Sequence, residues 1–198
     1  GVLQGMDAPE PLFMRCLPQG TVRRLLTLCH ARGWYANWYI GRKIFVEHFD
    51  AAYFHAYRTV EDFKVREVGD DFLSYTENVI QCVIRDLTGA VEPKVAVVER
   101  ELPGEIAAQQ NTGTSADLTP PGVTKALGLS FLMEQYGLTP AEVMACGDAD
   151  NDLPMLRFAG TAVVPENGLP EAKALATYHA ASNDEDGIAK AIEQLVLA

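Results

Sequence analysis

Short apolar runs alternate with longer amphipathic segments from Thr119 to the end of the chain. The runs predict strands, and the segments, which carry apolar residues at helical spacing, predict helices. In order, we expect helix 124–136, strand 143–146, helix 152–159, strand 161–164, helix 169–176, strand 178–181 and helix 188–197. Strands that alternate with helices pair in parallel through right-handed crossovers. The pattern therefore predicts an α/β fold with a doubly wound parallel sheet, of which these strands form only a part.

The stretch from Pro18 to about Thr119 has a less regular pattern, which predicts an inserted α/β region. A helix is expected over 21–32 because Val22, Leu25, Leu26 and Cys29 fall on one face. The other expected elements are a hairpin of strands 34–40 and 43–48, a helix over 51–57 and a strand over 94–98, while residues 79–83 fit either a strand or a helix. Before this region, residues 1–17 read as a hairpin with a polar turn at 7–11.

Four aromatic residues gather in the first strand of the central hairpin, namely Trp34, Tyr35, Trp38 and Tyr39. A platform that stacks a sugar ring is one interpretation. Because side chains alternate across a strand, half of the four point inward in any case, and we expect them to pack in the core.

Composition and charge exclude several classes of protein. The 198 residues have a net charge of −11, which argues against a nucleic acid partner, since phosphate backbones require a basic surface. No run reaches the roughly 18 to 20 apolar residues that a membrane span needs, so we expect no membrane partner. The four cysteines lack metal-type spacing, and buried thiols in a cytoplasmic protein are the simplest interpretation.

Candidate chemistry follows the apolar run at 143–146, where Gly147 is followed by Asp148, Asp150, Asn151 and Asp152. Ligands of open α/β sheets bind beyond the carboxyl ends of the strands, and oxygen ligands favour Mg2+ over zinc. These residues are also common as turn formers and helix caps. A calcium loop is the remaining alternative, but its glycine and glutamate positions hold Leu153 and Ala159.

A second candidate is Lys125, in the first turn of the helix expected over 124–136. Helix amino ends favour negative charge, so an anion held by Lys125 and nearby backbone N–H groups would explain a cation there. Taken alone, the residue reads as an ordinary surface lysine. A phosphorylated ligand also needs such a cation, and a metal, because the net charge of the chain would repel it.

Four segments together resemble the motifs of one enzyme superfamily. They are 122–125 (Gly-Val-Thr-Lys), 147–152 (Gly-Asp-Ala-Asp-Asn-Asp), 160–167 (Gly-Thr-Ala-Val-Val-Pro-Glu-Asn) and 182–187 (Ser-Asn-Asp-Glu-Asp-Gly). In sequence and spacing they resemble the haloacid dehalogenase superfamily, and within it the Cof-type sugar-phosphate phosphatases. The resemblance is strong over 120–198 and looser over 1–119. It implies a core hairpin over 1–17, an α/β cap domain that selects substrate over 18–119, and the carboxyl-terminal half of a Rossmann-like core over 120–198.

The resemblance implies a Mg2+-dependent phosphatase that acts on a small phosphorylated metabolite, such as a sugar phosphate, through an aspartyl phosphate. By position, Lys125 would be catalytic and would bind phosphate together with Asn151. Asp148 would bind the metal, while Asp152 would support it from outside its ligand shell and cap the helix that follows.

The first two motifs of the family have no counterpart in the sequence. The string Asp-x-Asp-Gly, which holds the nucleophile in this family, occurs only at 184–187, where it matches the segment before the last helix. We therefore expect that the chain by itself is inactive, that a longer parent chain supplies the missing strands, and that the incomplete sheet promotes self-association. Residues 99–116 are shorter than the helix and strand usual in the family, so either the cap is reduced or residues are absent. A non-catalytic metal-binding or interaction fragment and a phosphomutase of the same superfamily remain alternatives.

Overall fold

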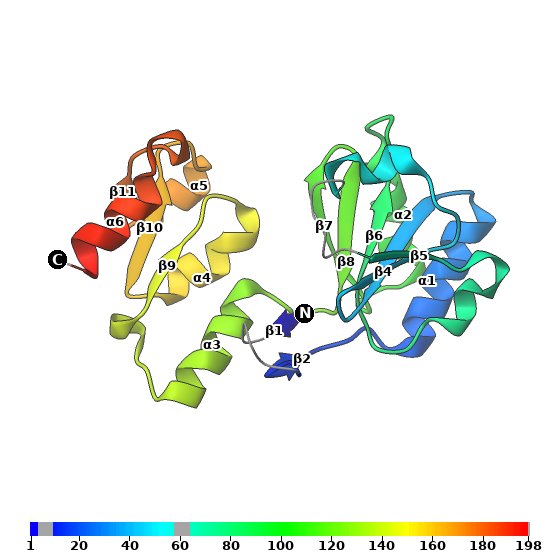
Figure 1. The fold of residues 1–198 in the computed structure, drawn as a ribbon, viewed down its shortest axis with the longest axis horizontal. Coiled ribbons are helices and arrows are strands. Elements are labelled where there is room, and N and C mark those ends of the chain that lie inside the picture. Colours follow the sequence, from blue (N-terminus) through cyan, green and yellow to red (C-terminus); the bar gives the residue numbers. More distant parts are fainter. Residues whose placement is uncertain (4–9, 58–63, 198) are drawn as a thin grey trace. The chain divides into compact units, whose positions relative to one another are not determined.

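The computed structural model describes residues 1–3, 10–57 and 64–197. Two compact units are present, Gly1–Val123 and Thr124–Ala198 (Figure 1). The first unit contains residues 1–17 together with residues 18–119, and the second begins at Thr124. The boundaries expected for a core hairpin, a cap and a core half stay a prediction. None of the helices within the described ranges combines the length and the apolar composition that a membrane crossing requires.

The N-terminal unit is built on a six-stranded sheet in the order β5-β4-β3-β6-β8-β7. Its strands are β3 (Tyr35–Ile40), β4 (Lys43–Val46), β5 (Lys64–Glu67), β6 (Val79–Arg85), β7 (Ala107–Thr112) and β8 (Ser115–Thr119). Neighbouring strands are antiparallel except β4 and β5, which are parallel. The hairpin predicted over 34–48 is therefore present, and the undecided segment at 79–83 is a strand.

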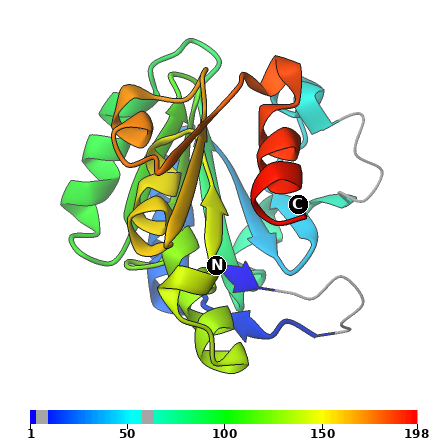
Figure 2. The ribbon, with the colours of Figure 1, turned by 90° about the vertical axis from the view of Figure 1, so that its left-hand side faces the viewer.

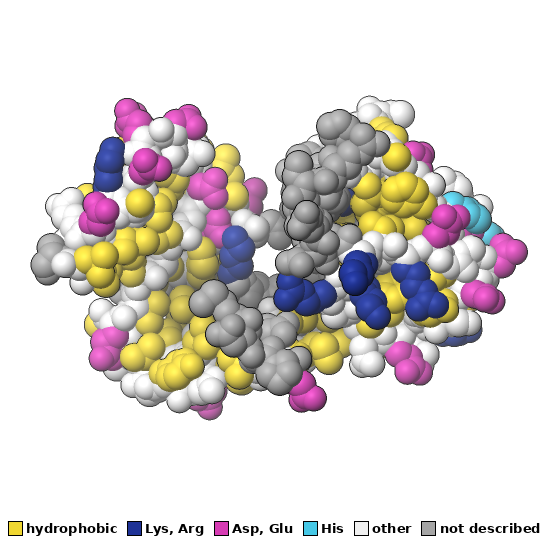
Figure 3. All heavy atoms as spheres, viewed as in Figure 1, with side chains coloured by type: hydrophobic (Ala, Val, Ile, Leu, Met, Phe, Trp, Pro, Cys, Tyr) yellow, Lys and Arg dark blue, Asp and Glu magenta, His cyan; other side chains and the backbone are white. Residues whose placement is uncertain are grey.

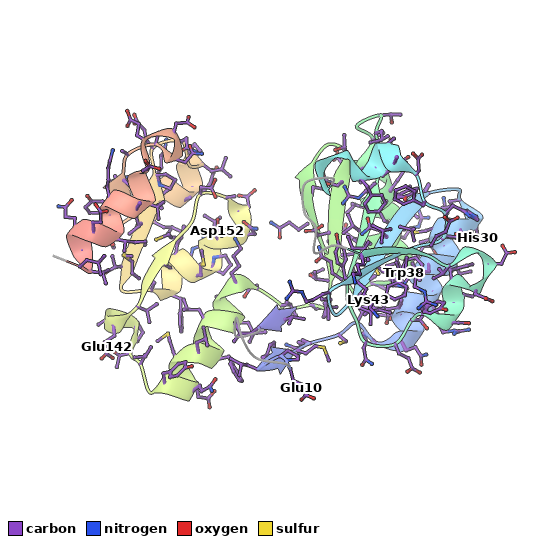
Figure 4. All side chains as sticks on the ribbon, in the orientation of Figure 1. Glu10, His30, Trp38, Lys43, Glu142 and Asp152 are labelled. Atoms are coloured by element: carbon purple, nitrogen blue, oxygen red, sulfur yellow. The ribbon has the colours of Figure 1, made fainter. Side chains whose placement is uncertain are left out.

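Two helices, α1 (Gln19–Ala31) and α2 (Val91–Glu101), pack their apolar residues on one face of this sheet. The four apolar residues predicted on one face of α1 are all buried there. Trp38 is buried between the sheet and these helices, and its Nε1 donates a hydrogen bond to the Tyr75 carbonyl at 2.7 Å (Figure 4). Its role is packing, as alternation along the strand predicts.

The opposite face of the sheet is partly covered by the 3-10 turn η1 (Ala51–Tyr57), where a helix was expected. Phe54 of η1 packs against Ile44 and Val46, and Tyr35 stacks on Tyr53 with ring centroids 3.9 Å apart. A second 3-10 turn, η2 (Gly69–Ser74), precedes β6.

The strand predicted over 94–98 is wrong, because these residues lie inside α2. Val91, Val95 and Val98 are buried at helical spacing, so the run of β-branched residues reflects one packed helix face rather than a strand. A helix and a strand do meet in the stretch 99–116, since α2 begins before it and ends at Glu101, and β7 lies within it. That this region is shorter than in the family stays a prediction.

The predicted hairpin over 1–17 is present as the antiparallel pair β1 (Val2–Leu3) and β2 (Phe13–Met14). Its predicted turn at 7–11 lies partly outside the described residues. The four cysteines are free thiols, of which Cys29 and Cys82 are buried.

The C-terminal unit contains a three-stranded parallel sheet in the order β11-β10-β9. Its strands are β9 (Met144–Cys146), β10 (Thr161–Pro165) and β11 (Tyr178–Ala180), and its helices are α3 (Lys125–Tyr136), α4 (Leu153–Phe158), α5 (Pro170–Lys173) and α6 (Gly187–Leu195). Ala162 and Val164 face α4 and α5, whereas Val163 between them faces α6. Figure 2 shows the helices on both sides of these strands. The predicted doubly wound arrangement is therefore confirmed in this unit.

A short turn leads from α3 to β9. Thr139 and Glu142 form the predicted capping box, in which Glu142 Oε2 accepts from the Thr139 N–H at 2.9 Å, but it opens a single 3-10 turn, η3 (Pro140–Glu142).

Helix α3 is apolar around most of its surface, yet Met133 is its one buried side chain among those described. In Figure 3, hydrophobic side chains lie exposed along the lower edge of this unit, where α3 runs.

Candidate functional site

The candidate site forms where β9 ends. Gly147 continues the ladder of β9 through a hydrogen bond from its N–H to the Val163 carbonyl at 3.2 Å. The chain then turns through η4 (Asp150–Asp152) into α4. A Cβ atom at position 147 would lie 2.4 Å from Cβ of Asp152, so this turn leaves room for glycine alone. The glycine thus allows the Asp152 side chain to fold back against the strand end.

Asp152 connects the two candidate segments that the sequence placed far apart. Its Oδ1 accepts a hydrogen bond from Lys125 Nζ at 2.5 Å. Its Oδ2 accepts from the backbone N–H groups of Asp148, at 2.9 Å, and Ala149, at 3.1 Å. Figure 4 labels Asp152 beside the carboxyl end of β9. One carboxylate therefore holds both Lys125 and the start of the acidic loop.

The charges of this pair differ in their access to solvent. The Asp152 side chain is 3% exposed and the Lys125 side chain 52% exposed. Burial alone disfavours the ionised form of Asp152, but hydrogen bonds from Lys125, Asp148 and Ala149 outweigh it, and the pKa of this carboxyl lies below its usual value. Asp152 is therefore a buried anion that holds a partly exposed cation.

Lys125 occupies the first position of α3, as predicted. The preceding residue, Thr124, caps the helix, since its side chain accepts a hydrogen bond from the Leu127 N–H at 3.2 Å. Gly122, in the turn before it, has a φ of 74°, a conformation that favours glycine. The cap and the turn fix the backbone position from which the Lys125 side chain extends.

The other predicted site residues, Asp148 and Asn151, are exposed on the same loop. The structure thus brings Lys125 and Asp152 into contact, and it places the Asp148 backbone on the same carboxylate. Asp152 does not cap α4 as expected, because its oxygens bond to the N–H groups before η4 and not to those of the helix. In the described part of the chain, no three His, Cys, Asp or Glu side chains form a metal-binding group.

Two loops that follow the neighbouring strands support the site. The Leu169 N–H donates to the Asp148 carbonyl at 2.8 Å, and a Cβ at Gly168 would lie 3.4 Å from Asp148 Cα and only 2.8 Å from Val164 Cγ1. Asn167 Oδ1 accepts from the Asn183 N–H at 3.0 Å. The sequence pattern gave Asn167 no role, although an asparagine directly after a strand was the available signal.

Asp184, Glu185 and Asp186 lie immediately before α6, and Gly187 is the first residue of that helix. Asp186 is at the helix boundary with a φ of 56°, and its side chain makes no capping hydrogen bond. Both aspartates are exposed and follow β11. The segment therefore precedes α6 without capping it through a side chain.

A family model described as haloacid dehalogenase-like hydrolase matches residues 6–192. Among curated proteins, the 5-amino-6-(5-phospho-D-ribitylamino)uracil phosphatase YbjI of Escherichia coli is 34% identical over 145 residues, which cover 73% of this chain and 50% of that protein. The chloroplastic endoribonuclease YBEY of Arabidopsis thaliana is 33% identical over 123 residues, covering 62% of this chain but 21% of that protein. The chain spans at most about half the length of these two relatives.

Solved structures give the same picture over nearly the whole chain. A haloacid dehalogenase-like hydrolase from Bacteroides thetaiotaomicron matches with a TM-score of 0.85 and 32% identity, covering 94% of this chain and 70% of that one. The subclass IIB sugar phosphatase BT4131 matches with a TM-score of 0.78 and 25% identity, covering 96% and 71%. The fold and the family branch predicted from the motifs are both confirmed.

Proposed function

Because this chain belongs to the family of haloacid dehalogenase-like hydrolases, we propose that it forms the cap and part of the core of a Mg2+-dependent phosphatase. The proposed substrate is a small phosphorylated metabolite such as a sugar phosphate. Support for the substrate class comes from relatives named as a ribitylaminouracil phosphatase and a sugar phosphatase. We place the enzyme in the cytoplasm, because its thiols are free.

The observation that carries this proposal is the Lys125–Asp152 pair at the carboxyl end of β9. A lysine ammonium has three N–H donors, and Asp152 accepts one of them. The half-exposed ammonium can therefore donate to the oxygens of a phosphoryl group while Asp152 fixes its position. In a chain with a net charge of −11, the exposed Lys125 ammonium offers a phosphate a positioned cation. Asp152 balances the charge of that lysine, so a bound Mg2+ would have to supply the remaining positive charge.

The acidic loop supplies the remaining roles. Asp148 offers an exposed carboxylate, and it would hold Mg2+, which proteins often bind through one or two carboxylates. Asp152 has both oxygens occupied by N–H donors, so it would support the metal indirectly by holding the Asp148 backbone. Asn151, exposed on η4, would contact the phosphate. A bound Mg2+ would neutralise charge on the phosphoryl oxygens.

Binding of inorganic phosphate to the chain, with and without Mg2+, tests the site. We expect Lys125→Met to weaken phosphate binding about tenfold, since a hydrogen bond from a charged donor is lost. Lys190→Met, which removes an exposed lysine from α6, is the matched control and should leave the affinity unchanged. Equal affinities for the two variants would contradict the proposal and favour a non-catalytic fragment.

A further inference from the structure

A cavity of about 570 Å3 lies on the side of the N-terminal unit that carries α1 and α2. Small-molecule sites in proteins have volumes of roughly 300–1,000 Å3, so this one is large enough for a ligand. Its apolar lining comes from Leu28 and Ala31 of α1, Leu73 of η2 and Leu102 directly after α2. The three leucines also pack in or against the core of this unit, so the lining is held in place by the fold.

Three charged side chains border the cavity, namely Arg23, Arg24 and Glu101. Arg24 forms an ion pair with Glu105, and Glu101 forms one with the arginine that precedes it, at 2.8 Å. Arg23 differs, because its Nη1 donates to the neutral Leu73 carbonyl at 2.8 Å. Among the described residues, no carboxylate forms an ion pair with it. One positive charge at the border is therefore unbalanced.

We propose that this cavity binds a small monocarboxylate with an apolar body. The carboxylate accepts hydrogen bonds from Arg23, and the apolar body covers Leu28, Leu73 and Leu102. The site goes beyond the proposed phosphatase function, since none of its residues belongs to α3 or to the loop after β9.

The chemistry of the border selects a carboxylate that carries one charge. A guanidinium has five N–H donors, of which Arg23 uses one, and two of the others can bind both oxygens of a carboxylate. The bond to the Leu73 carbonyl holds this guanidinium beside an apolar side chain of the lining, so head and body of one ligand have adjacent contacts. A second negative charge would meet no further unpaired cation, and Glu101 would repel it.

Three probes test the site on the 198-residue chain: hydrocinnamate, phenethylamine and acetate. The first two share a phenyl ring and a two-carbon chain and differ in the sign of the charge, while acetate has the carboxylate without the ring. We expect hydrocinnamate to shift the methyl NMR signals of Leu28, Leu73 and Leu102 saturably, because the aromatic ring lies over them. Phenethylamine should bind about tenfold more weakly through the lost charge-assisted hydrogen bonds, and acetate through the lost apolar burial.

Arg23→Gln should weaken binding of hydrocinnamate about tenfold and remove the preference over phenethylamine. Arg157→Gln is the matched control, because it removes the same charge from an exposed position on α4 and should leave the affinity unchanged. If Arg23→Gln fails to unfold cooperatively, Ala31→Glu takes its place. This variant adds a negative charge at an exposed lining position and should weaken hydrocinnamate by a similar factor.

Equal methyl shifts with hydrocinnamate and phenethylamine would overturn the inference and leave an unselective apolar surface. Equal affinities of Arg23→Gln and Arg157→Gln for hydrocinnamate would do the same. Lys125→Met should bind hydrocinnamate as the natural chain does, whatever its effect on phosphate. A loss in that variant would place the probe at the end of β9 and contradict the assignment to this cavity.

Discussion

Asp152 is the side chain on which the candidate site depends at the scale of single residues. Its carboxylate accepts three hydrogen bonds while nearly excluded from solvent, and each donor stabilises the ionised form. These hydrogen bonds tie Lys125, on α3, to the loop at Asp148. A neutral side chain at position 152 would therefore loosen both.

The lowered pKa of Asp152 predicts how stability depends on pH. A carboxyl whose folded pKa lies below its unfolded value of about 3.9 stabilises the fold fully above that value, and loses this contribution as pH falls through the folded pKa. We expect Asp152→Asn to reduce the free energy of unfolding by about 1–2 kcal/mol near neutral pH. The difference from the natural chain should shrink below about pH 4.

Urea unfolding at a series of pH values measures this difference. Asp150→Asn, on an exposed side chain of the same turn, controls for the loss of one negative charge. A constant difference between the natural chain and Asp152→Asn down to acid pH would show that the carboxylate is not the stabilising group.

At the scale of elements, we expect replacement by alanine to change the stability in opposite directions at two glycines of the C-terminal unit. Gly147→Ala would drive a methyl group into Asp152, and overpacking of this kind destabilises by about 1–3 kcal/mol. Gly128→Ala, in the interior of α3, meets open space and should stabilise by about 0.5–1 kcal/mol through helix propensity. Urea midpoints of the two variants give the comparison, and phosphate binding should suffer in Gly147→Ala alone. Similar midpoints would mean that the turn relaxes around the added methyl.

The elements also show what the sequence pattern could predict. Strands β9 and β10 followed from short apolar runs because each is covered on both faces. The edge strand β11 is covered on one face, since His179 is exposed, and it followed from its position in the alternation of strands and helices. Helix α2 was mistaken for a strand because four of the five residues at 94–98 are apolar and three are valines, which favour strands locally. Strand β7 was missed because alanine, glutamine and asparagine give no alternation.

The site was predictable in its residue types but not in its bonding. Spacing placed Lys125 and the acidic loop at strand and helix ends, where topology brings them together. That Asp152, rather than Asp148, would contact the lysine depends on the backward fold of one side chain over Gly147. No periodicity in the sequence encodes that rotamer.

At the scale of the whole molecule, each unit has its own sheet and its own core. Within the described residues of the C-terminal unit, β9 pairs with β10 alone, so one edge of this strand has no sheet partner. Such an edge invites pairing with another strand. Self-association of the 198-residue chain through this edge stays a prediction, which light scattering after size-exclusion chromatography can check.

The same view of the whole molecule predicts that the 198-residue chain binds phosphate without turning over a phosphate ester. The aspartyl phosphate that the resemblance implies needs a nucleophilic aspartate beside the phosphoryl group, and covalent catalysis without its nucleophile loses the pathway itself. The string Asp-x-Asp-Gly occurs only at 184–187, at the start of α6, whereas Asp148 follows β9 and Lys125 bonds to Asp152 of the same loop. We therefore expect hydrolysis of p-nitrophenyl phosphate with Mg2+ to stay at the rate measured for Lys125→Met. Turnover by the natural chain that Asp148→Ala abolishes would contradict this prediction, because a nucleophile would then have to come from the residues present.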